Sequence, residues 1–380
     1  MKICLIAESY PPALGGVEFA LQHIVEGLIA KGNEVWVVTS SWQRHAPSVE
    51  QSGSLRVSRV KTFPFFHRLW FILFSLPTVL KAARWADLVQ GSTFAGGPPA
   101  FFGGWLTKKR KVLLVHEVYG SRWFQFERNP LRALFYYLTE RIIVRLPFDH
   151  YVAPSRYSKV SVCSLGVPQS KVSVIYHGDS TLDRPTLTKD QVRSQLGFGE
   201  QHFIFLAFGR AGVTKGFEYF ADAMPAILRQ IPRARFVLVL SGYDRRILSR
   251  LERQISRLPA SICKLVPPLS REILASYVHA ADCFVIPSLS EGFGFSALEA
   301  CNANKVVVAA DAGSLPEIVF GKHVFVKPGS HEAIAEGCKK AYEGDVTERA
   351  PKAFDWAQTV SQYCVVYERQ FVPKIGRAHV

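Results

Sequence analysis

The segment from Phe203 to Leu240 reads FIFLAFGRAGVTKGFEYFADAMPAILRQIPRARFVLVL and contains the pattern that decides the fold. The apolar run at residues 203–208 predicts a buried strand, and residues 209–216 predict a glycine-rich loop. The helical spacing of apolar residues across 217–230 predicts a helix, and residues 235–240 predict the next strand. A strand, a glycine loop, a helix and a parallel strand form the unit that opens a doubly wound sheet.

The same order occurs about 200 residues earlier in the chain. Residues 2–7 predict a strand, the Pro/Gly segment 11–16 a loop, residues 17–30 a helix and residues 34–39 a second strand. Further β-branched runs at 88–91, 112–116 and 150–153 extend the first sheet, and those at 263–266, 283–286 and 306–309 extend the second. The sequence therefore predicts an α/β protein with two Rossmann-like domains. Neither glycine loop matches G-x-G-x-x-G, so a dinucleotide site is disfavoured.

Composition and charge narrow the classes of protein. The chain has 380 residues, of which 48% are hydrophobic and 20% are charged, so it is globular rather than disordered. Its net charge of +15 favours anionic partners such as nucleic acid, acidic lipid or a phosphorylated small molecule. We expect no secretory signal and no membrane-spanning helix. The seven cysteines contain no Cys-x-x-Cys pair, which favours a reducing, cytoplasmic compartment.

The densest site signal is PSLSEGFGFSALEA at residues 287–300. It follows an expected strand, makes a glycine-rich turn and opens a helix whose N-terminus would present N–H groups to an anion. Glu299 lies about one turn into that helix, where a carboxylate suits the vicinal hydroxyls of a ribose or sugar. The Glu291–Glu299 spacing alone also arises by chance, and the surrounding motif is what favours a functional site.

A second signal lies in the loop GRAGVTKG at residues 209–216. Arg210 and Lys215 are cations in a loop expected to be flexible, so both could converge on a diphosphate and stabilise charge on a leaving phosphate. The alternative is that both are solvated surface cations.

Together these motifs resemble those of the GT-B glycosyltransferases, specifically the retaining enzymes of family 4. The resemblance covers nearly the whole chain. The residues that carry it are Glu8-Ser9-Tyr10-Pro11-Pro12, Gly15-Gly16-Val17-Glu18, Gly209-Arg210 with Lys215-Gly216, Glu291 with Glu299, and Asp311 to Val319.

The resemblance implies two domains that face each other across a cleft. We expect residues 1–178 to form an acceptor-binding domain and residues 179–353 a nucleotide-sugar-binding domain, with a helix at 354–371 that crosses back to the first domain. Residues 375–380 are unlike the preceding helix and are interpreted as a non-native tail.

The resemblance also implies roles for individual residues. Arg210 and Lys215 would hold the donor diphosphate, and Glu291 would contact the transferred sugar. His116 would lie near the reacting centre, although a single histidine is more often structural. The donor-binding residues implied are Gly15, Gly16, Leu269, Phe293, Gly294, Phe295, Ser296 and Glu299, of which Leu269 falls where the family holds the nucleobase and Glu299 would bind the ribose.

The chain also departs from the family pattern. His177-Gly178-Asp179-Ser180 stands where the family often has Asn-Gly-Val-Asp, Pro267-Pro268 replaces a usual glycine, and Ser314 replaces the second glycine of a late pair. These changes affect the identity of the nucleotide and sugar rather than the class. His177 and Asp179 could be metal ligands but more often mark a turn. The sequence has no Asp-x-Asp, so we expect no metal and no cofactor beyond the nucleotide-sugar substrate.

From residue 59 to residue 145 the sequence alternates Lys and Arg with aromatic residues, as in Phe63 to Phe74, Trp105 with Lys108 to Lys111, and Arg122 to Phe124. This composition suits an anionic membrane surface. The alternative is a buried helix with solvated cations between elements. Nucleic acid is disfavoured because no nucleic-acid motif is present.

The resemblance therefore implies a metal-independent, retaining hexosyltransferase that moves a sugar from a nucleotide-diphosphate sugar to an acceptor. We expect this acceptor to be a lipid-linked or polysaccharide intermediate of cell-surface glycan synthesis. We expect the enzyme in the cytoplasm, with a peripheral position on the inner face of the cell membrane as a second expectation. The alternatives are a non-catalytic two-domain sugar-binding protein and another GT-B enzyme, such as a nucleotide-sugar epimerase or a phosphorylase.

Overall fold

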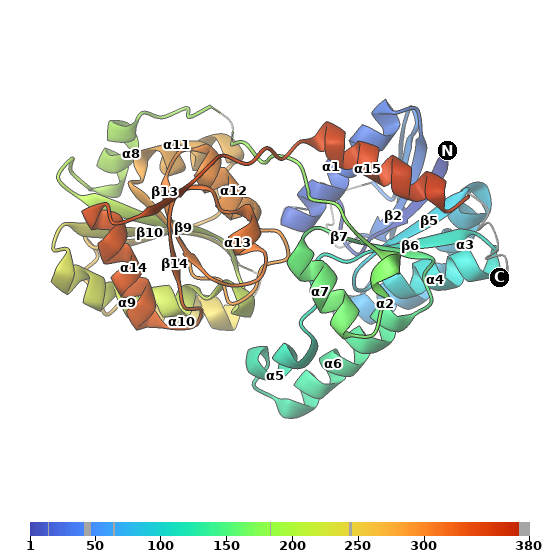
Figure 1. Cartoon of the computed structure of the whole chain (residues 1–380), viewed down its shortest axis with the longest axis horizontal. Helices are drawn as coiled ribbons and strands as arrows, with labels where there is room; N and C mark the ends of the chain where they lie inside the picture. The colour runs from blue at the N-terminus through green and yellow to red at the C-terminus, as the bar shows by residue number, and fades with distance from the viewer. Residues whose placement is uncertain (14, 42–46, 64, 183, 243–244, 372–380) are drawn as a thin grey trace, which may run out of the picture. The chain divides into compact units, whose positions relative to one another are not determined.

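A computed structural model describes residues 1–13, 15–41, 47–63, 65–182, 184–242 and 245–371. The chain divides into two compact units (Figure 1). Unit 1 comprises Met1–Gly178 and the segment that starts at Phe354, and unit 2 comprises Asp179–Ala353. The tail predicted at residues 375–380 lies outside the described residues.

Unit 1 is built on an eight-stranded sheet in the order β3-β4-β2-β1-β5-β6-β7-β8. All neighbouring strands are parallel except β3 and β4. The strands are β1 (Lys2–Ile6), β2 (Glu34–Ser40), β3 (Val49–Ser52), β4 (Leu55–Val60), β5 (Leu88–Ser92), β6 (Arg110–Leu114), β7 (His150–Ala153) and β8 (Val172–Val174). The helices are α1 (Gly16–Ala30), α2 (His67–Phe74), α3 (Leu76–Trp85), α4 (Gly97–Leu106), α5 (Trp123–Phe126), α6 (Pro130–Arg145), α7 (Arg156–Ser164) and α15 (Trp356–Arg369), with 3₁₀ turns η1 (Gly120–Arg122) and η2 (Gln169–Lys171).

Helices cover both faces of this sheet, as its continuous apolar strands require. One face packs against α1 and α15, which supply Leu21 and Tyr363 to a buried cluster. The other face packs against α2, α3, α4, α6 and α7, and there the buried cluster includes Phe71 and Val144. Figure 1 shows α15 alongside α1, although more than 300 residues separate them in the chain. Thr359 Oγ1 donates to the Tyr176 carbonyl at 2.8 Å and helps to hold α15 in place.

Unit 2 is built on a seven-stranded sheet in the order β11-β10-β9-β12-β13-β14-β15, parallel except for the last pair. The strands are β9 (Phe203–Ala211), β10 (Ala234–Gly242), β11 (Cys263–Val266), β12 (Cys283–Ile286), β13 (Val306–Ala310), β14 (Gly321–Val326) and β15 (Thr347–Arg349). The helices are α8 (Lys189–Leu196), α9 (Phe217–Gln230), α10 (Arg245–Ile255), α11 (Arg271–Ala280), α12 (Phe295–Asn302), α13 (Leu315–Ile318) and α14 (His331–Glu343), with the 3₁₀ turn η3 (Val213–Lys215).

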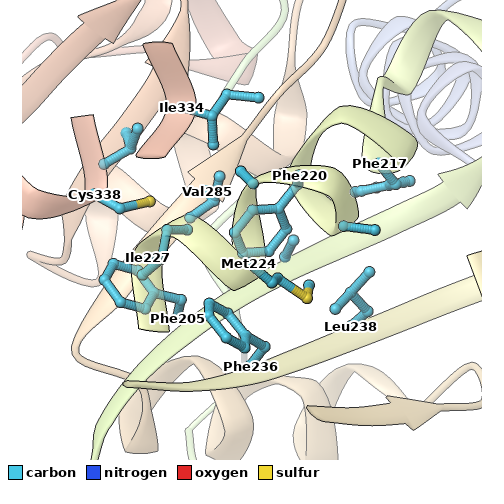
Figure 2. Packing of buried hydrophobic residues seen from close by; sticks show 14 of the residues in the cluster. Phe205, Phe217, Phe220, Met224, Ile227, Phe236, Leu238, Val285, Ile334 and Cys338 are labelled. Atoms are coloured by element: carbon cyan, nitrogen blue, oxygen red, sulfur yellow. The ribbon is translucent and has the colours of Figure 1, made fainter. Parts of the chain in front are cut away.

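One hydrophobic cluster of unit 2 lies between a face of this sheet and α9, α10 and α14 (Figure 2). Phe220 of α9 is fully buried and meets Phe236 of β10 edge to face, with ring centroids 5.8 Å apart. Ile334 and Cys338 of α14 complete the same cluster. This packing fixes α9 on the sheet and so fixes the loop that leads into it.

In each sheet, the order in which successive strands are added reverses at one point. The position of this switch point indicates where a ligand can bind. In unit 2 the chain leaves β9 for β10 on one side and later places β12 on the other side of β9. In unit 1 the corresponding strands are β1, with β2 on one side and β5 on the other. In doubly wound sheets ligands bind outside the carboxyl ends of the strands at such a switch point.

The predicted fold class, two Rossmann-like α/β domains, is confirmed. Three local predictions were wrong in extent. The loop expected at 209–216 is not a flexible loop, because β9 continues through Ala211 by pairing with Gly242 of β10, and residues 213–215 form η3. Strand β6 ends at Leu114, where its pairing with Ser92 ends, so His116 lies two residues beyond it. Helix α15 begins at Trp356, because the Asp355 side chain caps it, and ends at Arg369.

The contact of α1 with α15 predicts that the effect of Gly27→Ala on stability depends on the residue at position 360. A Cβ added at Gly27 would lie 2.3 Å from Cγ2 of Val360, whose side chain is buried and stiff. We expect Gly27→Ala to lower the free energy of unfolding by about 1–3 kcal/mol, because overpacking outweighs the gain in helix propensity. In a Val360→Ala background the same change should become neutral or stabilising. Urea unfolding of the four proteins measures this coupling, and equal effects of Gly27→Ala in both backgrounds would show that the close packing is absent.

Candidate active site

Two loops meet at the switch point of unit 2, one after β9 and one after β12. The backbone N–H of Leu289 donates to the Thr214 carbonyl at 2.7 Å and joins them. Gly216 has φ +65°, and a Cβ at this position would lie 2.1 Å from the Pro287 carbonyl oxygen. Only glycine fits both this left-handed backbone and this close approach. The glycine in the β9–α9 loop is therefore needed to bring the two loops together.

This contact between the two loops places Lys215 against Glu291. Nζ of Lys215 lies 2.6 Å from Oε1 of Glu291, and Ser288 Oγ donates to the same oxygen at 2.9 Å. Glu291 is almost fully buried, whereas the Lys215 side chain is partly exposed. A buried carboxylate needs such partners, because its charge is otherwise costly to desolvate. The two side chains predicted to contact phosphate and sugar thus form one ion pair.

The backbone around Glu291 is fixed from the β13 side of the sheet. Ser314 Oγ donates to the Phe293 carbonyl at 2.7 Å and to the Glu291 carbonyl at 3.2 Å. Gly313 has φ +61°, and a Cβ there would lie 2.4 Å from the Glu291 carbonyl oxygen. Ser314, which departs from the family's second glycine, therefore takes on a structural role that a glycine side chain could not fill.

Helix α12 starts directly after this loop. Gly294 has φ +97° and caps the helix, and its carbonyl accepts the N–H groups of Ala297 and Leu298 at 3.0 and 3.2 Å. Phe295 and Ser296 form the first turn, and the ring of Phe295 meets that of Phe293 with centroids 4.9 Å apart. The predicted donor-binding residues of this motif thus surround the positive end of a helix dipole, which favours an anion.

Glu299 projects from the next turn of α12 and is buried. Ser180 Oγ donates to its Oε1 at 2.8 Å, and Arg271 Nη1 donates to the same oxygen at 3.2 Å. Burial raises the pKa of Glu299 to about 7, and the Ser180 hydrogen bond and the Arg271 charge counteract part of that shift. The protonation of this carboxyl group therefore changes within the physiological pH range.

The remaining predicted residues of unit 2 lie at strand ends. Arg210 is at the carboxyl end of β9, opposite Ser241 of β10. Leu269 follows β11, the edge strand, and is partly buried. It is two residues before Arg271, whose guanidinium reaches Glu299. The segment expected to hold the nucleobase is thus connected to the expected ribose ligand.

In unit 1, Gly15 and Gly16 follow β1 at the switch point of that sheet. Gly15 is the N-terminal cap residue of α1 and accepts the N–H of Phe19 at 2.9 Å. The loop therefore leads into a helix N-terminus, as in unit 2.

His116 lies just beyond β6 in a polar setting. Its Nε2 and the Ser92 hydroxyl are 2.8 Å apart, and its backbone N–H donates to Thr93 Oγ1 at 3.2 Å. Ser158 Oγ donates to the His116 carbonyl at 3.3 Å. Burial lowers the pKa of His116 to about 4, so the imidazole is neutral at pH 7 and can donate or accept a hydrogen bond.

His177 belongs to the same surroundings, with its ring 6.2 Å from that of His116. Burial, followed by the nearby His116, lowers the pKa of His177 to about 3. Its ring also stacks on Trp356. Asp179 instead accepts hydrogen bonds from Asn302 and Thr181 in unit 2. Within the described ranges, no group of three or more His, Cys, Asp or Glu side chains could hold a metal ion.

Sequence reasoning missed several residues that contact the predicted site residues within each unit. Arg271 and Ser180 hold Glu299, Ser288 holds Glu291, and Ser92 holds His116. Ser180 is 119 residues from Glu299 in the chain, so no local spacing connects them. Ser288 lies inside the recognised motif, three residues before Glu291, and was the one partner that the sequence could have indicated.

Two family models match the chain and together cover most of it. The model described as Glycosyltransferase Family 4 matches residues 14–180, and the model described as Glycosyl transferases group 1 matches residues 188–355. These matches fall on unit 1 and unit 2 respectively.

Individual proteins are similar over nearly their whole length. An uncharacterised glycosyltransferase of Methanocaldococcus jannaschii is 27% identical over 355 residues, which are 89% of this chain and 88% of the relative. A D-inositol 3-phosphate glycosyltransferase of Jonesia denitrificans is 29% identical, covering 93% and 91%. The structure of Anabaena HepE in complex with UDP-glucose superposes with a TM-score of 0.73 at 19% identity, covering 97% of this chain and all of that chain. With both of its units matched to glycosyltransferase models and its fold shared with a GT-B structure, the chain belongs to the GT-B glycosyltransferases of the family 4 and group 1 type.

Proposed function

We propose that this glycosyltransferase moves a hexosyl group from a nucleotide-diphosphate sugar to an acceptor and retains the anomeric configuration. The observation that carries the proposal is the Lys215–Glu291 ion pair at the switch point of unit 2, beside the N-terminus of α12. It combines a cation for a phosphate with a carboxylate for a sugar hydroxyl. The HepE structure, which is described with UDP-glucose, supports a nucleotide-sugar donor for this fold.

The donor diphosphate would lie over the first turn of α12. Lys215 and Arg210 would neutralise its charge, and the positive end of the helix dipole would add to their effect. As the bond between the sugar and the diphosphate breaks, negative charge grows on the leaving oxygen, and these groups stabilise it. This arrangement supports a metal-independent reaction, because protein cations can supply what a divalent ion supplies elsewhere.

The nucleoside would bind beside the donor phosphate. Glu299 has Oε1 occupied by Ser180 and Arg271, which leaves Oε2 to accept hydrogen bonds from the ribose hydroxyls. Leu269 would provide apolar contact to the base. The two partners fix the carboxylate before the ligand arrives, so little side-chain entropy is lost on binding.

Glu291 would orient the transferred sugar rather than attack it. Its Oε1 is held by the Lys215 ammonium and the Ser288 hydroxyl, which reduce the nucleophilicity of the carboxylate. In the proposed reaction the bond from the anomeric carbon to the phosphate oxygen breaks, and a bond to the acceptor oxygen forms on the same face. The acceptor proton passes to the leaving phosphate, so no covalent sugar–Glu291 intermediate is needed.

Unit 1 would contribute the acceptor side. A neutral His116, with a pKa of about 4, is a poor general base and would instead hydrogen-bond a sugar hydroxyl near the reacting carbon. Gly15 and Gly16 would present backbone N–H groups to a phosphate. The net charge of +15 favours an anionic acceptor, and we infer a glycan or lipid-linked intermediate of cell-surface polysaccharide synthesis handled on the cytoplasmic side of the membrane.

The first prediction from the proposed function concerns the two cations. Lys215→Ala and Arg210→Ala should each lower kcat by about 10²–10³, because each removes one preorganised charge donor from the leaving phosphate. The matched control is Lys322→Ala, which removes a cation from β14. Steady-state rates with a panel of nucleotide-sugars measure the effect. Near-normal rates in both variants, with folding intact, would exclude the diphosphate role.

The second prediction concerns stereochemistry. With an α-linked donor, the first product seen by NMR should have an α linkage, in the wild type and in Glu291→Gln alike. The variant should be slower, and mass spectrometry should detect no sugar attached to Glu291. A β-linked product would exclude the same-face mechanism, and a trapped adduct would make Glu291 the nucleophile.

The third prediction uses the pKa of Glu299, which is raised to about 7. Only the ionised carboxyl accepts hydrogen bonds on both oxygens, so its contribution to ribose binding should be present above pH 7 and lost as the pH falls toward 6. The affinity ratio of wild type to Glu299→Gln for a nucleoside diphosphate should therefore fall by up to about tenfold between pH 8 and pH 6. Calorimetry measures both affinities at each pH. Because protonation of the ligand's phosphate affects both proteins equally, it cancels in their ratio. A ratio independent of pH would contradict the assignment.

A further inference from the structure

Exposed apolar side chains gather on unit 1. Among the described residues, every large hydrophobic residue that is exposed lies in unit 1 except Val213 and Tyr342. Most of those in unit 1 lie on α2, α4, α5 and α6 or just before α2. Helices α2, α4 and α6 pack on the same face of the sheet, and α4 contacts both of the others. A concentration of this kind marks an interaction surface rather than random exposure.

Helix α6 carries the clearest part of this surface. Its exposed residues include Leu131, Leu134, Phe135, Leu138 and Ile142, spaced so that they form one stripe along the helix. Leu131 is 76% exposed, Phe135 63% and Ile142 64%. The opposite side of α6, with Ala133, Ile143 and Val144, is buried against unit 1. The helix is therefore apolar on its outer face as well as on its inner face.

The outer stripe of α6 contains no acidic residue. The helix has one acidic residue, Glu140, which is buried and accepts the backbone N–H groups of Tyr119 and Gly120 at 3.0 and 2.6 Å. These bonds fix the orientation of α6, because turning the stripe inward would break them. Figure 1 shows α5 and α6 extending away from the strands of unit 1.

Arginine and tyrosine residues border the stripe. Arg132 donates to the Tyr136 hydroxyl at 3.2 Å, and Arg141 donates to the Tyr137 hydroxyl at 3.0 Å. Each guanidinium also lies about 6 Å from the ring of its tyrosine. Long cations and amphipathic rings beside an apolar stripe are the side chains found where an in-plane helix meets lipid headgroups.

We propose that α6 docks unit 1 on an anionic lipid bilayer, with its outer stripe among the acyl chains and its arginines at the headgroups. No described helix is long and apolar enough to cross a membrane, so α6 would lie in the plane of the surface. The stripe supplies the buried apolar area. Arg141 supplies charge that is complementary to phosphate headgroups, and Arg132 adds to it although Glu127 lies 3.4 Å from its guanidinium and offsets part of its charge. A protein groove would satisfy the apolar face but would not require cations on both of its borders.

The sequence prediction covered residues 59–145 and named segments at 63–74, 105–111 and 122–124, none of which lies on α6. In the structure Arg110 and Lys111 each lie 3.4 Å from Asp149, which offsets part of their charge. They line a hollow with Trp105 and Lys108 at the end of α4. The alternative of a buried helix does not describe α2, where only Phe71 is buried, but α3 and α4 each bury several residues. The α4 segment can strengthen binding, but α6 provides the apolar anchor.

The experiment measures partition of the full chain onto vesicles of phosphatidylcholine, with and without about one third phosphatidylglycerol. The test variant is Leu131→Ser/Phe135→Ser/Ile142→Ser, which changes only exposed positions. The matched control is Val160→Ser/Val365→Ser, exposed aliphatic residues on α7 and α15. Two charge variants complete the set, Arg132→Gln/Arg141→Gln and serine at each of residues 108–111. Thermal unfolding without lipid confirms that each variant folds.

We expect wild type and the valine control to bind anionic vesicles and the α6 variant to bind more than about tenfold less. The Arg132/Arg141 variant should lose the preference for anionic over neutral vesicles, and rising salt should weaken the wild type in the same way. The serine variant of 108–111 should keep more binding than the α6 variant.

The proposal is wrong if wild type binds no vesicle, if it binds neutral and anionic vesicles equally at low salt, or if the α6 variant binds as wild type does. It is also wrong if light scattering shows a lipid-free dimer that the α6 substitutions dissociate, since the stripe would then be an interface between copies. Donor hydrolysis without lipid should be the same in wild type and in the α6 variant, so the membrane proposal and the proposed function fail separately.

Discussion

The close approach of Gly216 to the Pro287 carbonyl is the constraint on which the site in unit 2 depends. It lets the loop after β9 lie against the loop after β12, and the Leu289–Thr214 hydrogen bond holds them there. Lys215 then reaches Glu291, which compensates a buried carboxylate with the cation proposed to bind phosphate. A side chain at position 216 would separate the loops and leave both charges without their present partner. One glycine therefore connects the backbone topology of the sheet with the electrostatics of the proposed donor site.

The two units combine the same topology with different side chains. Each sheet has its switch point at the first strand of a βαβ unit, and each first loop leads into a helix N-terminus suited to an anion. In unit 2 the side chains nearby are charged and tightly paired, whereas in unit 1 His116 is kept neutral by burial among serine and threonine hydroxyls. This difference fits our proposal of a donor side in unit 2 that stabilises a diphosphate and an acceptor side in unit 1 that positions hydroxyl groups.

Sequence patterns predicted most of the fold, because apolar strands and glycine punctuation are local signals. They failed where the structure of a segment depends on a neighbouring strand. The glycines around Arg210 suggested a loop, but pairing with β10 extends β9 through this residue. The pairing of Glu299 with Ser180 and Arg271 was also invisible, since these residues meet only after the sheet has formed. For α6 the apolar residues occur around most of the helix, so the sequence could not tell which side faces outward; the inward-facing Glu140 decides it.

We propose that Lys215, positioned by its ion pair with Glu291, binds the donor diphosphate, and calorimetry can test this without knowledge of the acceptor. The measurement compares a nucleoside diphosphate with the corresponding monophosphate on wild type and on Lys215→Ala. We expect wild type to bind the diphosphate at least about tenfold more tightly than the monophosphate, and Lys215→Ala to lose most of this preference while its monophosphate affinity changes little. An unchanged preference in Lys215→Ala would mean that the ion pair is structural and that the diphosphate binds elsewhere.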